Sequence, residues 1–152
     1  MTFTRAHDGD VYAALDLGTN NCRLLLAYPA FRRVRGVRSL KAVDSFSRIV
    51  RLGEGVSQTG NLSPDAVERT MAALRICARK LEGYSVGKAR FVATEACRRA
   101  ANAKDFVRRV QEELGFTIEI ITTEEEARLA ILGCCSLLQP RMKKAVALDI
   151  GG

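Results

Sequence analysis

One segment near the start of the chain reads Val11-Tyr-Ala-Ala-Leu-Asp-Leu-Gly-Thr-Asn-Asn-Cys-Arg-Leu-Leu-Leu-Ala-Tyr28, with two short apolar runs on either side of the polar break Gly18-Thr19-Asn20-Asn21. Glycine and asparagine at the break favour a two-stranded hairpin over one continuous helix. Gly18 leaves backbone N–H groups uncovered, and the short polar side chains that follow it add donors. We therefore interpret the break as a loop that can surround a phosphate group, with an ordinary surface hairpin as the alternative.

A similar pattern recurs at the other end of the sequence. Ala145-Val-Ala-Leu-Asp149-Ile-Gly151-Gly152 is again an apolar run followed by an aspartate and glycine. Two such units, far apart in one chain, indicate two phosphate loops that face one ligand. The repeat also predicts a second, similar domain. We expect residues 1–144 to form the N-terminal lobe of a longer protein, and residues 145–152 to be the first strand and the start of the phosphate loop of a second lobe.

Composition narrows the class of protein. The 152 residues are 47% hydrophobic and carry a net charge of +7, which predicts one globular domain with an anionic partner. No nucleic-acid-binding module is recognisable, so specific nucleic-acid binding is disfavoured. Five cysteines form an odd set without a Cys-x-x-Cys pair, which favours reduced thiols and a cytoplasmic protein. No apolar run is long enough to span a bilayer. The only histidine is His7, which argues against zinc chemistry and histidine-based catalysis.

Turn residues and hydrophobic spacing predict the order of the elements. The first three strands form a meander whose third strand covers residues 43–52, after a basic turn and strand edge at residues 31–41. Ser63 and Pro64 mark the start of a long helix that Gly83 ends, and Asn102 is expected to cap a later helix. The remaining predicted elements are strands at 89–94, 117–121 and 145–150, a turn into a helix at 95–99, and helices at 102–114 and 123–138. The order β-β-β-α-β-α-β-α, with a final strand, is that of an α/β fold with a mixed sheet and helices on its faces.

Three consecutive carboxylates, Glu124, Glu125 and Glu126, follow a predicted strand at the start of a helix. Thr123 and Glu126 have the spacing of a capping box, and acidic residues suit the positive end of a helix dipole. The functional alternative is that one glutamate points into a cleft and orients an attacking water molecule. The two interpretations are compatible, because different glutamates can perform each role.

Other charged side chains near predicted strand ends are candidate ligands for phosphate or metal. Arg98 follows a strand at the start of a helix, and a guanidinium group suits bidentate contact with phosphate. Arg99 could serve equally, and Arg23 lies two residues past the first turn; each could instead be an ordinary solvated arginine. Asp149, with Asp16 facing it, is typical of a Mg²⁺ ligand, directly or through water. The alternative for each aspartate is a strand-end carboxylate that binds loop amides.

Taken together, these motifs resemble the exopolyphosphatase/guanosine pentaphosphate phosphohydrolase (Ppx/GppA) family. The matching pieces, in order, are Asp16-Leu-Gly-Thr-Asn-Asn-x-Arg23, Arg51-Leu-Gly-x-Gly55, Ala93-Thr-Glu-Ala-x-Arg98, Asn102 with Phe106, Glu119-Ile-Ile with Glu124-Glu-Glu-Ala-Arg128, and Asp149-Ile-Gly-Gly152. Each piece is modest alone, but the ordered set is specific and covers nearly all of the chain. The resemblance implies a lobe of the actin, Hsp70 and sugar-kinase fold, similar to ribonuclease H.

The resemblance also implies an activity, namely hydrolysis of the terminal phosphoanhydride bond of inorganic polyphosphate or of pppGpp, with Mg²⁺. It implies catalysis by Glu126, phosphate contacts from Thr19, Asn20 and Arg98, and a second phosphate loop that contains Asp149. To these we add Asn21, Arg23, Gly151 and Gly152 as candidate phosphate contacts, and Asp149 and Asp16 as candidate metal ligands. Two departures from the family pattern affect these loops. Asn21 stands where serine is common, and Thr122-Thr123 stand where Ser-Gly is common. They change a donor in the phosphate loop and stiffen the turn before Glu126.

A second hypothesis needs no catalysis. The same loops could form a regulatory module that binds an alarmone or a nucleotide, with Glu126 acting only as a helix cap. A phosphotransferase similar to the sugar kinases is a third and weaker option. The apolar strand at residues 145–150 could also pair with a second copy of a shortened chain, which would be an artefact. A homodimer is a separate possibility.

Overall fold

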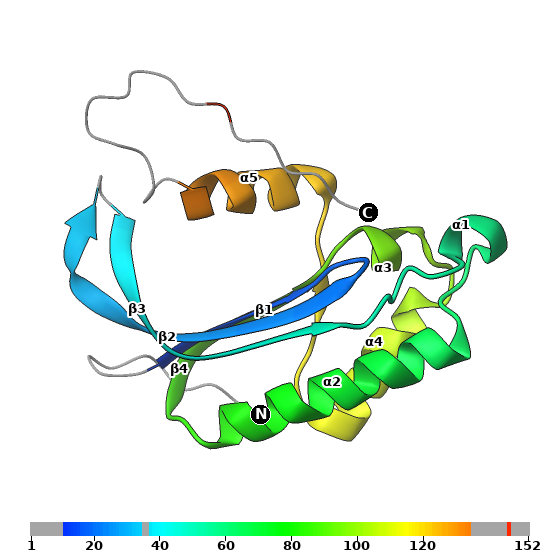
Figure 1. The fold of residues 1–152 in the computed structure, drawn as a ribbon, viewed down its shortest axis with the longest axis horizontal. Helices are drawn as coiled ribbons and strands as arrows, with labels where there is room; N and C mark the ends of the chain where they lie inside the picture. Colours follow the sequence, from blue (N-terminus) through cyan, green and yellow to red (C-terminus); the bar gives the residue numbers. More distant parts are fainter. Residues whose placement is uncertain (1–10, 35–36, 135–145, 147–152) are drawn as a thin grey trace.

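The computed structural model describes residues 11–34, 37–134 and 146 of the chain. The described residues form one five-stranded sheet in the order β3-β2-β1-β4-β5, flanked by helices (Figure 1). The strands are β1 (Val11–Leu17), β2 (Asn21–Val34), β3 (Val37–Ile49), β4 (Val86–Ala93) and β5 (Glu119–Ile120). The helices are α1 (Val56–Thr59), α2 (Pro64–Glu82), α3 (Glu95–Arg99), α4 (Ala103–Leu114) and α5 (Thr123–Cys134). This is the expected α/β lobe of the actin and sugar-kinase type, with the strand meander first.

The predicted hairpin at the first polar break is confirmed. Strands β1 and β2 pair antiparallel, with Leu17 opposite Cys22, and the Gly18 N–H donates to the carbonyl of Asn21 at 2.9 Å. Strand β3 continues the meander antiparallel to β2, whereas β4 and β5 add parallel to β1 and to β4. The sheet is therefore mixed, as the sequence predicts, and β1 lies at its centre.

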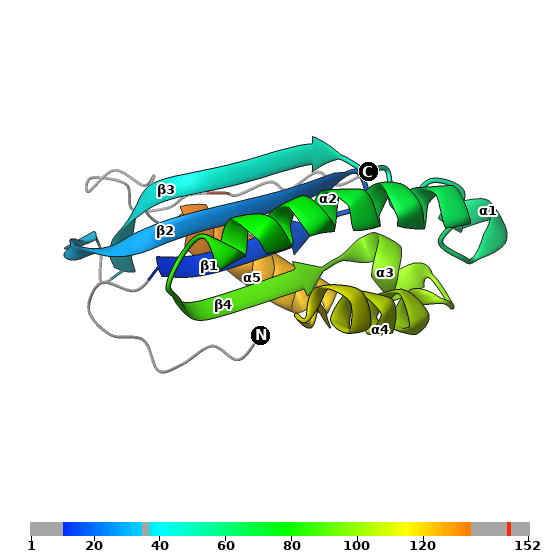
Figure 2. The ribbon, with the colours of Figure 1, turned by 90° about the horizontal axis from the view of Figure 1, so that it is seen from below.

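The two faces of the sheet are covered differently. Helices α2 and α4 lie against one face, and α5 lies over the other (Figures 1 and 2). Along β1 the alternate side chains from Val11 to Leu17 are buried in the core that α2 and α4 complete, whereas Asp16 belongs to the opposite set. The alternation thus turns Asp16 toward the face that carries α5.

Three strands differ from their predicted bounds, since β4 and β5 also depart from the predicted strands at 89–94 and 117–121. The third strand is Val37–Ile49 rather than residues 43–52, because backbone pairing between β2 and β3 continues far out into the basic segment that we interpreted as a turn and strand edge. It ends before residue 50 because the Val50 and Arg51 N–H groups donate instead to the Asn20 carbonyl, at 2.8 and 3.0 Å. The last predicted helix is described over Thr123–Cys134; its predicted end and the strand at residues 145–150 lie outside the described residues.

Both predicted N-cap residues stand at the helix starts, but only one of them caps with its side chain. Ser63 caps α2 as predicted, because its hydroxyl accepts from the Ala66 N–H at 3.3 Å. Asn102 occupies the N-cap position of α4 as predicted, but its side chain makes no capping bond to that helix. Instead the Asn102 amide pairs with the backbone of Leu62, accepting from its N–H at 2.8 Å and donating to its carbonyl at 3.0 Å. A side-chain amide carries both a donor and an acceptor, so Asn102 can bond to the N–H and the carbonyl of Leu62 as the backbone of a neighbouring strand would.

The prediction of buried, reduced thiols is confirmed for the described cysteines inside the fold. Cys22, Cys77 and Cys97 are buried and unbridged, and burial raises the pKa of Cys97 to about 12. Such thiols behave as small hydrophobic side chains. Within the described ranges, no helix combines the length and the apolar character needed to cross a membrane.

Candidate functional site

A cleft of about 690 Å³ opens where the β1–β2 loop, the start of α3 and the start of α5 meet. Seven of the predicted site residues line it, namely Asp16, Thr19, Asn20, Asn21, Arg23, Arg98 and Glu126. The other three, Asp149, Gly151 and Gly152, lie outside the described residues. The structure therefore brings these seven residues together, although more than 100 positions separate Asn20 from Glu126.

The cleft lies at the carboxyl ends of three neighbouring parallel strands. Consecutive strand ends are joined by backbone bonds: the Thr94 N–H donates to the Leu17 carbonyl and the Ile121 N–H to the Ala93 carbonyl, both at 3.1 Å. The loop after each strand then supplies part of the cleft wall. In open α/β sheets, ligands bind at this edge, where the loops that follow parallel strands converge.

The phosphate-loop candidate, Gly18-Thr19-Asn20-Asn21, accepts backbone hydrogen bonds from the segment that follows β3. The Gly53 N–H donates to the Thr19 carbonyl at 3.0 Å, in addition to the two bonds to the Asn20 carbonyl. Gly53 also packs directly on Thr19, so that a Cβ at Gly53 would come closer than 3.0 Å to the Thr19 Cγ2. In the sequence, Gly53 stands out only as part of the Arg51-Leu-Gly-x-Gly55 motif. Its contact with Thr19 depends on tertiary packing, and the Arg51-Leu-Gly-x-Gly55 motif is the only signal that could have pointed to it.

Arg98 is the most constrained cation of the cleft. Its Nη1 donates to the Ile121 carbonyl at 2.9 Å, and its Nη2 donates to Glu126 Oε2 at 2.7 Å and to Glu95 Oε2 at 3.0 Å. Partial burial acts to lower the pKa of Arg98, but the bonds to Glu126 and Glu95 outweigh it and raise the pKa. With 18% of its side chain exposed, Arg98 is a fixed positive charge at the cleft wall.

Glu126 lies in the first turn of α5, but it does not belong to the capping pair that we predicted. The cap is one residue earlier: the Thr122 hydroxyl accepts from the Glu125 N–H at 3.2 Å, and the Thr122 carbonyl accepts from the Glu126 N–H at 3.0 Å. The shift arises because Ile121 still pairs with the sheet, which makes Thr122 the first residue able to start the helix. Glu126 is thereby released from capping and its carboxylate reaches Arg98 in the cleft.

Sequence reasoning missed one acidic residue of the cleft. Glu95 lines the cleft and binds Arg98 from the preceding turn of α3, and it lies 3.9 Å from Arg99, which is also at the cleft wall. The i, i+3 spacing of Glu95 and Arg98 on a helix is the signal that could have found it. The described wall of the cleft thus carries three arginines (Arg23, Arg98 and Arg99) and three carboxylates (Asp16, Glu95 and Glu126).

The described residues do not group three metal-ligating side chains in one place. Asp16 is a carboxylate that lines the cleft beside the phosphate-loop candidate. Mg²⁺ in phosphate-processing sites is usually held by one or two carboxylates together with phosphate oxygens and water. The donor set of the cleft therefore fits a magnesium ion that a bound phosphate completes.

Comparison with known proteins agrees with the fold and with the motifs. The sequence model of the Ppx/GppA phosphatase family matches residues 31–152. A solved Ppx/GppA family member from Aquifex aeolicus is 35% identical and superposes with a TM-score of 0.74, covering 86% of this chain and 41% of that one. An exopolyphosphatase-like protein is 31% identical with a TM-score of 0.75, covering 87% and 38%.

A third solved structure shows the same fold at lower identity. An exopolyphosphatase from Cytophaga hutchinsonii is 24% identical, with a TM-score of 0.70 and coverage of 81% of this chain and 38% of that chain. The chain spans about two fifths of the length of these structures. The family match over residues 31–152, with the fold and the ordered motifs, shows that this chain belongs to the Ppx/GppA phosphatase family.

Proposed function

We propose that this chain forms the N-terminal lobe of a phosphohydrolase that removes the terminal phosphate of inorganic polyphosphate or of a guanosine pentaphosphate such as pppGpp. One observation carries the proposal: Glu126 and Arg98 are in direct contact, at 2.7 Å, in the wall of the cleft that the glycine and asparagine loop also lines. A water-activating carboxylate, a phosphate-binding guanidinium and a phosphate loop are the parts that phosphoanhydride hydrolysis needs.

The proposed reaction is an in-line displacement. Backbone amides and the side chains of Thr19, Asn20 and Asn21, with Arg98 and Arg23, hold the phosphate chain. Glu126 accepts a proton as the oxygen of a water molecule bonds to the terminal phosphorus, and the bond to the bridging oxygen breaks. The shortened phosphate chain leaves with that oxygen and its electron pair.

A bound phosphate would compete with Glu126 for Arg98. Arg98 shares one nitrogen between Glu126 and Glu95, so an incoming phosphate oxygen must compete with both carboxylates for the same guanidinium. Phosphate on Arg98 would loosen its hold on Glu126, whose carboxylate could then turn to water. Glu126 would be free to contact water only when the substrate is bound.

A divalent cation, which we propose is Mg²⁺, would supply charge neutralisation for the phosphate oxygens. Asp16 would hold it from this lobe and Asp149 from the second loop, whose Gly151 and Gly152 would complete the phosphate contacts. This arrangement requires the second lobe, beginning near residue 145, that the internal repeat predicts. The three buried, unbridged thiols support a location in the cytoplasm.

The same contact also favours a second function. While Arg98 holds Glu126, the carboxylate is bound to the guanidinium group rather than to a water molecule, which suits a regulatory module that binds an alarmone or a nucleotide without hydrolysing it. Both functions use the same loops, but only hydrolysis depends on the Glu126 carboxylate.

The test is phosphate release from polyphosphate and from pppGpp by the complete two-lobed protein. Glu126→Gln is compared with the unchanged protein, and binding of each substrate is measured in parallel. Hydrolysis predicts turnover that Glu126→Gln removes while binding persists. Binding without phosphate release from either substrate would establish the regulatory module instead.

A further inference from the structure

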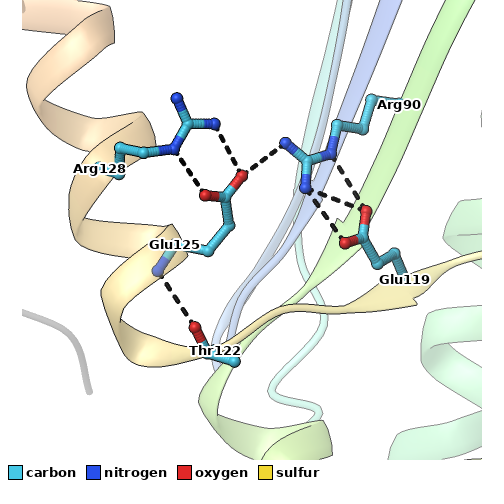
Figure 3. A network of polar contacts seen from close by, with 5 residues as sticks. All are labelled: Arg90, Glu119, Thr122, Glu125 and Arg128. Atoms are coloured by element: carbon cyan, nitrogen blue, oxygen red, sulfur yellow. Dashed lines mark hydrogen bonds and ion pairs between the residues drawn. The ribbon is translucent and has the colours of Figure 1, made fainter.

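Two neighbouring glutamates at the start of α5 have different partners. Glu126 faces the cleft and binds Arg98, whereas Glu125 faces the sheet and binds Arg90 and Arg128 (Figure 3). Consecutive residues on a helix differ in direction by about 100°. The turn therefore cannot present both carboxylates to the cleft, and the direction of Glu125 fixes the direction of Glu126.

Arg90 connects three elements through one guanidinium group. It lies on β4, and its Nη1 donates to Glu125 Oε1 on α5 at 2.7 Å. Its Nε and Nη2 bind the carboxylate of Glu119 on β5, at 3.0 to 3.1 Å (Figure 3). The planar fork thus binds two carboxylates at once, which is a geometry that lysine cannot reproduce.

Among the described residues, apolar burial contributes little to holding α5 in place. None of its residues is buried, and the apolar side chains of Ile131 and Leu132 are 56% and 43% exposed. A groove of about 610 Å³, lined by residues of the sheet and by Leu129 and Ala130 of α5, lies beside the helix. Without a buried apolar face, the position of α5 over the sheet depends on polar contacts at its first turn.

We propose that Arg90 is a positioning residue, which through Glu125 fixes the first turn of α5 and thereby aims Glu126 at Arg98 and the phosphate loop. The inference rests on the proposed function, because it assigns Arg90 a role in that reaction without contact to the substrate. It also explains why the helix begins with adjacent glutamates: Glu125 attaches the helix, which leaves Glu126 available for chemistry.

Several hydrogen bonds hold Glu125 in place. Glu125 accepts from Arg128 at 2.6 and 2.9 Å as well as from Arg90, and its N–H is bound by Thr122. Bonds from Arg128 and Arg90 lower the pKa of Glu125 to about 2, so the carboxylate stays ionised at any pH at which the enzyme would work. Charge networks with bidentate arginine are more effective than isolated surface pairs.

The experiment compares Arg90→Gln, Arg90→Lys and Arg108→Gln in the complete protein. Arg108→Gln is the matched control, because Arg108 makes an exposed ion pair to Asp105 on α4, at 2.7 Å, away from the cleft. The first measurement is hydrogen exchange of the α5 backbone amides, with those of α2 as the internal reference. The second is the separation of kcat from KM in phosphate release.

We expect Arg90→Gln to speed exchange in the first turns of α5 by about tenfold, with α2 unchanged. We expect kcat to fall by on the order of 10- to 100-fold with KM within about threefold, because the reacting group is misplaced while phosphate binding persists. Arg90→Lys keeps the charge but not the fork, so its kcat should lie between the other two. Arg108→Gln should match the unchanged protein in both measurements.

The two measurements separate the possible failures. If Arg90→Gln leaves α5 exchange at the level of Arg108→Gln, the attachment is refuted. If exchange rises but kcat does not fall, the positioning role is refuted. If the unchanged protein releases no phosphate from either substrate, the proposed function fails and Arg90 has no catalytic geometry to set, whatever the exchange result.

Discussion

The contact between Gly53 and Thr19 gives a sharp prediction about the phosphate-loop candidate. In Gly53→Ala the new methyl group would lie closer than 3.0 Å to the Thr19 Cγ2 and 3.4 Å from the Ala96 Cβ. Real Cβ atoms essentially never approach another heavy atom within 3.0 Å, so one side must move. The Ala96 side is close-packed core, so the displacement falls on Thr19 and the loop that carries it.

The expected cost follows from overpacking. Inserting a methyl group into a well-packed site costs about 1–3 kcal/mol, and each kcal/mol moves the Tm of a domain of this size by about 2–4 °C. A displaced Thr19 should also weaken anion binding, because one hydrogen bond to a charged group is worth about 1.5–3 kcal/mol, or roughly 10- to 100-fold in Kd. Denaturant unfolding and calorimetric titration with polyphosphate measure the two effects on the complete protein.

A second substitution tests the cause. Thr19→Ser removes the Cγ2 methyl group and keeps the hydroxyl, so Gly53→Ala with Thr19→Ser should recover most of the lost stability and binding. Gly55→Ala is the control, since Gly55 has a φ of +80° and no atom within 4 Å of an added Cβ. Its cost of about 1 kcal/mol comes from the backbone, and Thr19→Ser should not repair it. Full stability in Gly53→Ala, or a double variant no better than the single one, would refute the steric argument.

Three further predictions use other parts of the fold. Glu126→Gln should lower kcat for phosphate release by on the order of 10²- to 10⁴-fold with substrate binding within a few fold, and a loss below tenfold would remove Glu126 from the reaction. Asn102→Ala should destabilise the lobe by about 1–3 kcal/mol in urea unfolding, since it leaves the Leu62 N–H and carbonyl without their partner; an unchanged midpoint would contradict this. The pKa of Glu125 is depressed to about 2, so its stabilising contribution is present above the unfolded value near 4.5 and is lost as the pH falls toward 2. Urea midpoints between pH 2 and 6 should therefore fall less steeply in Glu125→Gln than in the unchanged protein, and parallel curves would count against the depressed pKa.

The parts of the fold that local pattern specifies could be predicted from the sequence. The hairpin at Gly18 follows from alternating apolar residues around a glycine and asparagine turn, and the start of α2 follows from Ser63 and Pro64. Both signals act within a few residues, so no tertiary information is needed. The convergence of Arg98 and Glu126 was predictable for a different reason, because parallel strands bring the loops at their carboxyl ends to one edge.

The parts that the sequence could not specify depend on partners that are distant along the chain. Asn102 is a residue type that often caps helices, but its side-chain amide bonds instead to the backbone of Leu62, which lies 40 residues away along the chain. The capping register at α5 was wrong by one residue because the end of the sheet, rather than the helix, decides where Thr122 leaves the strand. The Arg51-Leu-Gly-x-Gly55 motif marks Gly53 but does not show its role, since the constraint is the side chain of Thr19, which is distant along the chain.

The arrangement of the strand ends explains why Arg98 can contact groups that follow two different strands. The loops after β1, β4 and β5 supply the phosphate-loop candidate, the cations and the carboxylate, and backbone bonds between neighbouring strand ends fix their spacing. Arg98 follows β4, yet it bonds to the carbonyl at the end of β5 and to Glu126 on α5. In the proposed function, a phosphate that binds Arg98 would act on the contact that links Arg98 to α5 as well as on charge. The bond from Arg90 to Glu125 on the same helix turn would oppose a movement of α5. The cleft would then exchange the partner of Glu126 without moving its backbone, which is the property that a preorganised hydrolytic site requires.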